Sequence, residues 1–201
     1  MGRILLIRHA QSEALGAVLT GRLPEVPLTE AGHEAVQRLV ARLAAYPIHR
    51  VCSSPLQRTM ATAEPIARSH GLSVEPRAAL LEIDFGAWTG KTIAALDGDD
   101  VWRRFNTFRS GVAIPGGEHM LQVQQRMVCD VYGLALERPD WVTAVVGHAD
   151  PLRAVICYAC GMPLDGMLRL TIHPASVSVL DIYEDGLRLV CLNTTDGALP
   201  E

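Results

Sequence analysis

Two arginines and two histidines in this sequence are suited to one kind of chemistry. They occur as Arg8-His9, Arg58 and His148. An arginine side chain donates two parallel hydrogen bonds to the oxygens of a phosphoryl group, and a neutral imidazole can attack phosphorus. Phosphoryl transfer needs positioning, neutralised charge and an in-line nucleophile. The four residues are therefore a candidate phosphoryl-transfer site, provided that the fold brings them together.

Three short apolar runs precede these residues, and their pattern is typical of strands buried on both faces of a parallel sheet. In open α/β sheets, ligands bind beyond the carboxyl ends of the strands. A single histidine at such a place is more often structural, but several strands that deliver histidine and arginine to one rim favour a site. The runs are residues 4–7, 51–52 and 142–146.

Helical patterns lie between these runs. Thr29 precedes an apolar stripe at helical spacing, which predicts an N-cap and a helix that ends near Pro47. Asp150 is expected to cap a later helix, with Pro151 at its first position. Further helices are expected over residues 56–70 and about 118–137.

The C-terminal pattern differs, because alternating apolar residues flank an Asp185-Gly186 turn and predict a β-hairpin. Strands alternating with helices, followed by an antiparallel edge, predict an α/β fold, a three-layer αβα sandwich with a mostly parallel mixed sheet. We expect a single domain over residues 1–201, in which the weakly periodic residues 75–117 form an irregular excursion that covers the site.

Composition excludes several classes of protein. The 201 residues are 49% hydrophobic, enough for a sizeable core, and 18 Lys+Arg against 22 Asp+Glu give a net charge of −4. No global basic field is available for nucleic acid. No apolar run is long enough to span a bilayer, and the first residues lack a signal-peptide pattern, so we expect a cytoplasmic protein without a membrane partner. Only Lys91 is a lysine, and this surplus of arginine is compatible with an anion site or with compositional drift.

Known cofactor and metal motifs are missing from the sequence. It contains no G-x-x-x-x-G-K-[ST] and no G-x-G-x-x-G, and its histidines lack the spacing of zinc ligands. Five cysteines lie in apolar segments, and for the C-x-x-C of Cys157 and Cys160 packing is favoured over redox or metal chemistry. We therefore expect a site of histidine and arginine that uses neither a metal nor a cofactor.

The segment Arg8-His9-Ala10 closely resembles the R-H-G signature of the histidine phosphatase superfamily, which includes cofactor-dependent phosphoglycerate mutases and many small phosphatases. The resemblance covers nearly the whole chain, and it is specific because six motifs occur in the family's order. These are Arg8-His9, Gly21-Arg22 with residues 27–32, residues 53–59, Leu81-Glu82 with Gly86, Trp88 and Gly90, residues 115–118, and Gly147-His148.

The resemblance implies a role for each catalytic candidate. His9 would be the nucleophile that forms a phosphohistidine, while Arg8, Arg58 and His148 would hold the phosphoryl oxygens. Glu82 would protonate the leaving oxygen and then activate water, which requires a raised pKa near neutral pH. The alternative for Glu82 is an exposed loop carboxylate or a capping partner.

Other residues are weaker candidates for substrate binding. Arg22 would contact a phosphate or carboxylate, or else be a solvated loop arginine. Gln11 and Ser12 would line the pocket or cap the loop, and His119 occupies a position where relatives often carry serine. The full set of candidate binding residues is Arg22, Gln11, Ser12, Ala149 and His119.

The sequence departs from the family pattern at three places. Ala10 and Ala149 stand where glycines usually follow the two histidines, which we interpret as pocket reshaping. Leu15 stands where many relatives have an asparagine that donates to phosphate, a loss of about 0.5–1.5 kcal/mol. The segment 21–27 carries one residue more than the commoner G-R-x-D-x-P, with Glu25 in place of the aspartate.

The resemblance implies a phosphomonoesterase that hydrolyses a small phosphorylated metabolite through phosphohistidine. One alternative is a phosphomutase, although mutases of the family are generally longer after the acid-bearing motif. The other is a non-catalytic protein that binds a phosphorylated ligand. The expected partner is a small phosphorylated substrate, and the protein is expected to be a monomer or homodimer.

Overall fold

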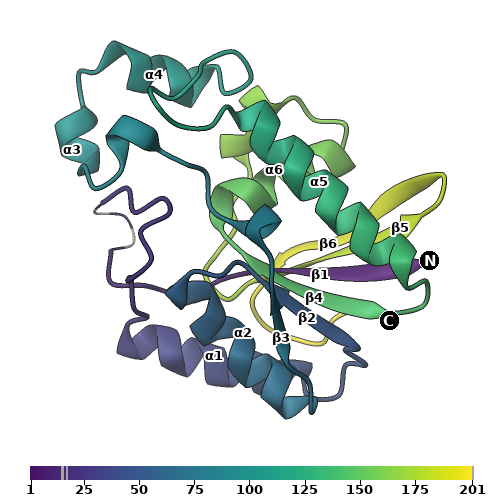
Figure 1. Cartoon of the computed structure of the whole chain (residues 1–201). Coiled ribbons are helices and arrows are strands. Elements are labelled where there is room, and N and C mark those ends of the chain that lie inside the picture. Colours follow the sequence, from purple (N-terminus) through teal and green to yellow (C-terminus); the bar gives the residue numbers. More distant parts are fainter. Residues whose placement is uncertain (15, 17, 201) are drawn as a thin grey trace.

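One mixed sheet forms the centre of the computed structural model, which describes residues 1–14, 16 and 18–200 (Figure 1). Within those residues six strands pair in the order β3-β2-β4-β1-β5-β6. The first four strands of this order are parallel to one another, β5 is antiparallel to β1, and β6 is antiparallel to β5. Leu15, the departure from the family's asparagine, lies outside the described residues. The strands are β1 (Gly2–Arg8), β2 (Arg50–Ser53), β3 (Val74–Pro76), β4 (Val142–Gly147), β5 (Val177–Tyr183) and β6 (Gly186–Thr194).

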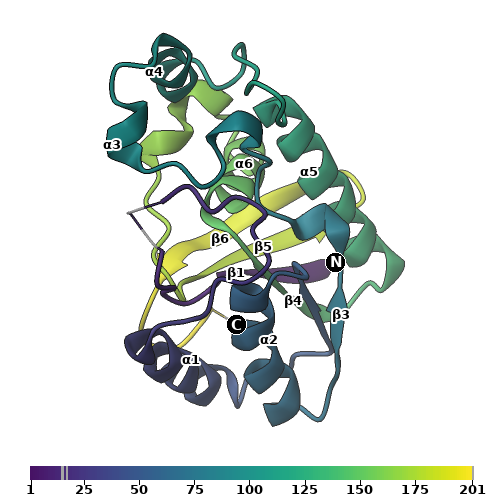
Figure 2. The same cartoon turned by 60° about the vertical axis from the view of Figure 1, so that its left-hand side comes forward.

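Helices cover both faces of this sheet. Helices α1 (Glu30–Leu43) and α2 (Gln57–Ser69) lie on one face, and α5 (Met120–Glu137) and α6 (Ala149–Ala159) lie on the other (Figures 1 and 2). Two hydrophobic clusters fill the two spaces between helices and sheet. This arrangement confirms the predicted three-layer αβα sandwich and the C-terminal hairpin.

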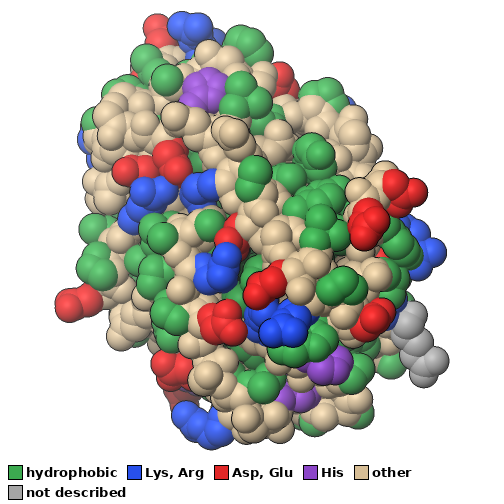
Figure 3. All heavy atoms as spheres, turned by 45° about the vertical axis from the view of Figure 1, so that its right-hand side comes forward, with side chains coloured by type: hydrophobic (Ala, Val, Ile, Leu, Met, Phe, Trp, Pro, Cys, Tyr) green, Lys and Arg blue, Asp and Glu red, His purple; other side chains and the backbone are tan. Residues whose placement is uncertain are grey.

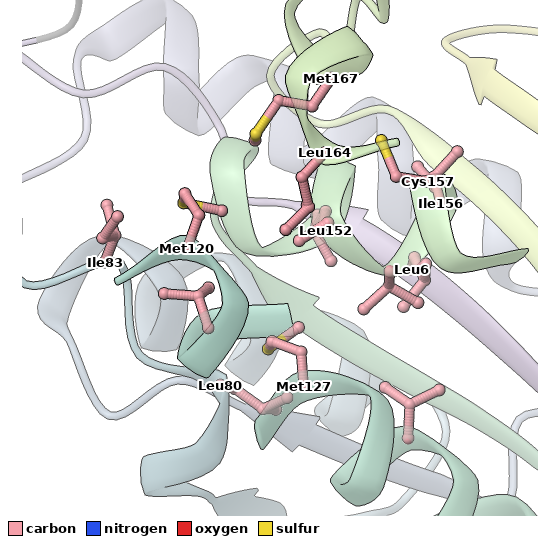
Figure 4. Packing of buried hydrophobic residues seen from close by; sticks show 14 of the residues in the cluster. Leu6, Leu80, Ile83, Met120, Met127, Leu152, Ile156, Cys157, Leu164 and Met167 are labelled. Carbon is pink, nitrogen blue, oxygen red and sulfur yellow. The ribbon is translucent and has the colours of Figure 1, made fainter. Parts of the chain in front are cut away.

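The cluster beneath α5 and α6 is continuous from strand to helix. Leu6 of β1 is buried with Leu152 and Ile156 of α6 and Met127 of α5 (Figure 4). Cys157 of α6 is buried in the same cluster, as the packing interpretation of the C-x-x-C requires.

Cys160 is exposed just beyond α6, and all five cysteines are free thiols. None of the described helices is long and apolar enough to cross a membrane. The face drawn in Figure 3 carries acidic and basic side chains in a mixed arrangement, without one large field of a single sign.

The register of the central strands sets the positions of the site residues. Arg8 pairs with Gly147 at the carboxyl ends of β1 and β4, so the next residues, His9 and His148, leave the sheet side by side. The backbone N–H of His9 donates to the carbonyl of Gly147 over 2.9 Å. Adjacent parallel strands thus deliver two histidines to one rim, as the sequence pattern predicts.

Helix starts agree with the sequence at one place and differ at another. Thr29 is the N-cap of α1, and its hydroxyl accepts from the N–H of Gly32 over 3.0 Å. The predicted capping role of Asp150 is wrong, because His148 holds the N-cap position and α6 begins at Ala149. Instead of capping, the Asp150 carboxylate forms ion pairs with Arg109 and Arg153.

The segment 75–117 contains more regular structure than its weak periodicity suggests. Trp88, Trp102 and Phe105 form an aromatic cluster within it, with ring centroids 5.3–6.2 Å apart. Its α-helices are only four and eight residues long, so they have too few turns for a repeating apolar stripe to mark them in the sequence. The short elements are the 3₁₀ helices η1 (Ala78–Leu80) and η2 (Gly86–Trp88) and the helices α3 (Ile93–Leu96) and α4 (Asp100–Thr107). A further 3₁₀ helix, η3, spans Leu164–Arg169 after α6.

A buried ion pair on β5 is expected to be a large contributor to stability. Asp181 is fully buried, and its carboxylate accepts from Arg3 at 2.6 and 3.0 Å and from Arg188 at 3.0 Å. Burial by itself raises the pKa of Asp181, but the hydrogen bonds from the two arginines outweigh it and hold the pKa below its usual value.

Replacement of Asp181 by alanine is expected to lower the free energy of unfolding by about 3 kcal/mol, because it leaves the Arg3 charge in a mostly buried position. Urea unfolding measures the loss, with the exposed Asp185→Ala as the control. Since the pKa is depressed in the folded state, the wild-type contribution should be present at neutral pH and fall as pH drops through that pKa. A loss below about 0.5 kcal/mol, ordinary for a surface substitution, would contradict this assignment.

Candidate active site

A pocket of about 180 Å³ lies beyond the carboxyl end of β1 and contains four of the five predicted catalytic residues. Arg8 and His9 come from β1 and the residue after it, Arg58 from the first turn of α2, and Glu82 from the loop between η1 and η2. The complete lining is Arg8, His9, Ser12, Ala14, Gly16, Val18, Leu19, Thr20, Gly21, Arg58, Glu82, Phe85, Ile93 and Asp150.

His9 is held in the form that a nucleophile needs. Its Nδ1 lies 2.7 Å from the carbonyl oxygen of Ala10, which can only accept, so Nδ1 carries the proton and Nε2 has the free electron pair. Burial, with the nearby charges of Arg58 and Arg8, lowers the pKa of His9 to about 3, although the Ala10 carbonyl opposes this shift. The imidazole is therefore neutral at pH 7.

His148 lies behind His9 and is fully buried. The two ring centroids are 5.2 Å apart at an interplanar angle of 63°. The Nε2 atom of His148 lies 2.8 Å from the hydroxyl oxygen of Ser54, while Nδ1 is buried without a hydrogen-bond partner among the described residues. A buried polar atom without a partner is costly, so Nδ1 is the His148 atom that still lacks a hydrogen bond, although His148 is not part of the pocket lining.

Arg58 is a buried cation and Arg8 a half-buried one, and neither has a carboxylate partner among the described residues. Arg8 donates to the carbonyl of Ile172 over 2.5 Å, and its Nε has no partner among the described residues. Arg58, 2% exposed, donates to the carbonyl of Gly21 over 2.7 Å. Neither guanidinium forms an ion pair within the part of the chain that the structure describes, and a buried charge needs a counter-charge. An anion placed between them would supply it.

Glu82 has the raised pKa that an acid catalyst requires. Burial and the negative charge of Asp150 raise the pKa of Glu82 to about 7, although the N–H of Ile83 and the charges of Arg58 and Arg8 oppose the shift. The Ile83 N–H donates to Oε1 of Glu82 over 2.9 Å. At neutral pH this carboxyl group can therefore both give and take a proton.

Asp150 is the pocket residue whose role the sequence analysis missed. Arg109 donates to one of its carboxylate oxygens and Arg153 to the other, each over 2.8 Å. Burial by itself raises the pKa of Asp150, but these two arginines outweigh it and keep the pKa below its usual value. The ionised carboxylate lines the pocket with Glu82 and favours the protonated form of Glu82. A Pro at the next position is compatible with a cap, so only the tertiary contacts reveal this role.

Arg22 does not line the pocket, contrary to the prediction of a direct substrate contact. Its Nε donates to the backbone carbonyl of Glu82 over 3.0 Å, and its Nη2 lies 2.8 Å from the carboxylate of Glu118. Arg126 of α5 donates to the same Glu82 carbonyl over 3.2 Å and also pairs with Glu118. Arg22 therefore holds the backbone of Glu82 in place.

The other four predicted binding residues also differ in whether they line the pocket. Ser12 is buried and lines the pocket. Gln11 is exposed and uses its backbone carbonyl to accept from Thr29, and His119 is the N-cap of α5, its Nδ1 accepting from the N–H of Leu121 over 3.2 Å. Ala149 begins α6 and is not part of the lining. Only Ser12 of the five is thus brought to the pocket.

Ala10 also differs from expectation. It is fully buried within the hydrophobic cluster under α1 and α2 and is not part of the pocket lining, so its methyl group does not reshape the pocket directly. Its backbone N–H donates to the hydroxyl of Thr62 over 3.1 Å. Among the described residues no group of three or more His, Cys, Asp or Glu side chains has an arrangement that could hold a metal ion.

Removal of the Arg22 side chain tests its new assignment. We expect Arg22→Met to lower kcat/KM by about tenfold for an alkyl phosphate, because a small displacement of the acid is costly. The loss should be smaller for 4-nitrophenyl phosphate, whose leaving group needs little protonation. Steady-state kinetics with both substrates measures it, and the exposed Arg38→Met is the control. If the loss is equal for both substrates and is due to a higher KM, the result would instead support direct contact between Arg22 and the substrate phosphate.

The family profile of the histidine phosphatase superfamily (branch 1) matches residues 4–195, so the chain belongs to this superfamily. Among curated relatives, phosphoserine phosphatase 1 of Hydrogenobacter thermophilus is 29% identical over 97% of this chain and 93% of that protein. The probable phosphoglycerate mutase GpmB of Salmonella choleraesuis is 29% identical over 92% and 86%, respectively. The α-ribazole phosphatase structure from Shigella flexneri superposes with a TM-score of 0.87, at 24% identity over 99% and 100% of the two chains. Family and fold are as predicted, and the phosphatase relatives support a phosphatase enzyme.

Proposed function

We propose that this protein hydrolyses small phosphomonoesters through a phosphohistidine intermediate. The observation that carries the proposal is the pocket in which the neutral His9 adjoins the half-buried Arg8 and the buried Arg58, neither of which forms an ion pair with a described residue. Glu82, with its pKa near 7, provides the acid in the same pocket. These groups are the donors, nucleophile and proton source that phosphoryl transfer requires.

In the first step the phosphoryl group binds between the two arginines and Nε2 of His9 attacks phosphorus. The phosphorus–oxygen bond to the leaving group breaks as Glu82 gives its proton to the leaving oxygen. An alcohol departs, the phosphoryl group remains on His9, and Glu82 is left as a carboxylate. The unpartnered Nδ1 of His148 supports a further contact to the phosphoryl oxygens.

In the second step water replaces the alcohol. The Glu82 carboxylate takes a proton from the water as its oxygen attacks phosphorus, and the bond between phosphorus and Nε2 breaks. Inorganic phosphate leaves, and the neutral His9 and protonated Glu82 are restored. The same carboxyl group thus acts as acid and then as base.

Mutase activity is the alternative that a relative's name favours. The Salmonella protein named a probable phosphoglycerate mutase aligns over most of both chains, so the two have similar lengths and length does not separate the activities. Phosphate release measured in parallel with isomerisation of 3-phosphoglycerate separates them. Isomerisation without phosphate release would contradict the hydrolase.

The proposed activity is tested by phosphate release from phenyl phosphate and a set of alkyl phosphates, with and without a chelator. We expect release that the chelator does not change, since the described residues supply the charge and the proton themselves. Activity that is lost with chelator and restored by a metal ion would contradict the proposed chemistry. Binding of phosphate without any turnover would instead favour a non-catalytic protein.

A further inference from the structure

The pocket has an apolar wall built from two segments that are far apart in sequence. Val18 and Leu19 come from the loop after β1, and Ile93 comes from the start of α3. Val18 forms a β-bridge with Thr92, and the N–H of Leu19 donates to the carbonyl of Lys91 over 2.9 Å. Figure 2 shows the loop after β1 beside the segment that carries α3. The wall is therefore held in place by the backbone.

This wall presents apolar surface toward a ligand. Ile93 is 43% exposed although it is a large aliphatic residue, and it lines the pocket together with Phe85 and Ala14. An exposed apolar side chain beside a polar catalytic centre gains by contact with an apolar part of a ligand. Because the two arginines bind the phosphoryl oxygens, the leaving group is the part of a phosphomonoester that can contact this apolar wall.

No cation remains in the described lining for a second anionic group of a substrate. Arg8 and Arg58 are its only cations, and both are needed for the phosphoryl group. Two other arginines near the site are already engaged. Arg22 pairs with Glu118, and Arg109, 4% exposed, pairs with Asp150 and lies 4.1 Å from the ring centroid of Phe105.

The ionised carboxylate of Asp150 adds to this selection. It contributes to the pocket, so a carboxylate on the substrate would be brought near a like charge, with no cation in the described lining beyond the two arginines to offset it. Like charges brought together on binding are strongly unfavourable. The hydroxyls of Ser12 and Thr20 are neutral donors, which serve a hydroxyl on the leaving group as well as an anion.

We infer that this site selects phosphomonoesters whose leaving group is uncharged and partly apolar, and that it disfavours those that carry a carboxylate. The inference rests on the proposed phosphatase activity and specifies its substrate class. Lys91 is exposed beside the apolar wall and is not part of the pocket lining. If the enzyme did accept a substrate with a carboxylate, Lys91 is the cation that would bind it.

Three substrates test the inference on the wild-type enzyme. Glycerol 3-phosphate and 3-phosphoglycerate have the same skeleton and a primary alcohol as the leaving group, and only the second carries a carboxylate. Benzyl phosphate adds an apolar leaving group. We expect kcat/KM for 3-phosphoglycerate to be at least about tenfold below that for glycerol 3-phosphate, and benzyl phosphate to be the best of the three. Equal or better use of 3-phosphoglycerate would overturn the inference.

A charge placed on the wall tests the location of the selectivity. Ile93→Lys should raise the ratio of kcat/KM for 3-phosphoglycerate over glycerol 3-phosphate by about tenfold, because it supplies the missing cation. Ile93→Gln, which adds polarity without charge, should leave the ratio unchanged. Val101→Lys, a matched change of a 37% exposed aliphatic residue outside the lining, should also leave it unchanged. An unchanged ratio in a folded Ile93→Lys enzyme would overturn the assignment to this wall.

The possible failures are distinguishable. If the enzyme hydrolyses phenyl and benzyl phosphate but prefers 3-phosphoglycerate, the proposed phosphatase activity stands and only the inferred selectivity is overturned. Loss of that preference in Lys91→Ala would then identify Lys91 as the carboxylate partner. Absence of hydrolysis with every substrate overturns the phosphatase and the selectivity together.

Discussion

Replacement of His9 by alanine is expected to reduce phosphate release by at least about a thousandfold, because no other group in the pocket can take the phosphoryl group from the substrate. The arginines and Glu82 remain in the variant, so the loss should be in kcat, with phosphate still bound. Release of phosphate from phenyl phosphate, followed at saturating substrate, measures the effect.

The control for this variant is His33→Ala, since His33 is exposed on α1 and away from the pocket lining. It should retain full activity. Circular dichroism and thermal unfolding of His9→Ala should show a folded protein, because among the described residues the removed ring makes one hydrogen bond, to the neighbouring carbonyl of Ala10, and one ring contact, with His148. A folded His9→Ala enzyme with activity near that of wild type would contradict the mechanism.

Replacement of Glu82 by glutamine is expected to have the second largest effect, and its size should depend on the leaving group. Alkyl phosphates leave as poor alkoxides unless they are protonated, so their kcat/KM should fall by about 10²–10⁴-fold. The loss should be much smaller for 4-nitrophenyl phosphate in the phosphorylation step. Burst kinetics separate that step from the later attack of water, which also loses its base. Glu64→Gln, at an exposed position on α2, is the control.

The same residue sets an expected pH dependence. Because the pKa of Glu82 is raised to about 7, its carboxyl group is protonated below that pH and loses the acid proton above it. For an alkyl phosphate, kcat/KM should therefore fall as pH rises through about 7. The fall should be absent in Glu82→Gln. A descending limb that stays in the variant would show that another group supplies the proton.

The Asp150 side chain gives this pH dependence a structural origin. Its ionised carboxylate, held by Arg109 and Arg153, makes the ionised form of Glu82 less favourable. The two residues reach the pocket from elements separated by 68 positions in sequence. An acid with a pKa near neutrality therefore depends on the packing of α6 against the segment 75–117.

The strands and longer helices could be predicted because their signals are local. The apolar runs at 4–7 and 142–146 mark strands that are almost completely buried, and Thr29 marks a helix start by its own side chain. The Asp150 cap was wrong because the same residue types suit a cap and an ion pair. Only the arrival of Arg109 and Arg153 decides between them, and these contacts are tertiary.

The catalytic candidates could be predicted for a similar reason, since Arg8, His9 and His148 follow their strands directly. The roles of Arg22 and His119 could not. Arg22 is engaged by Glu82 and Glu118, which lie 60 and 96 positions away. His119 caps a helix through its ring, a role that the commoner capping residues usually fill. The apolar wall of the pocket could not be predicted either, because it depends on the packing of two segments that are far apart in sequence.

The inferred selectivity separates this chain from a relative named for a different substrate. Phosphoserine, after which the Hydrogenobacter relative is named, carries a carboxylate and an ammonium group. Among its described lining residues this pocket offers a carboxylate no cation beyond the two arginines assigned to the phosphoryl group, so shared family and 29% identity do not carry that substrate over.

The most direct test of the central claim is to find the covalent intermediate. Cleavage after arginine gives a peptide of residues 9–22, or 4–22 if the Arg8-His9 bond resists, and His9 is the only histidine in either. Wild-type enzyme mixed with 4-nitrophenyl phosphate, quenched under alkaline conditions and digested should carry a phosphoryl group on that peptide. Glu82→Gln should carry more, because attack by water is slowed. Turnover with no phosphoryl group on the peptide in either enzyme, or with the group on another residue, would contradict nucleophilic catalysis by His9.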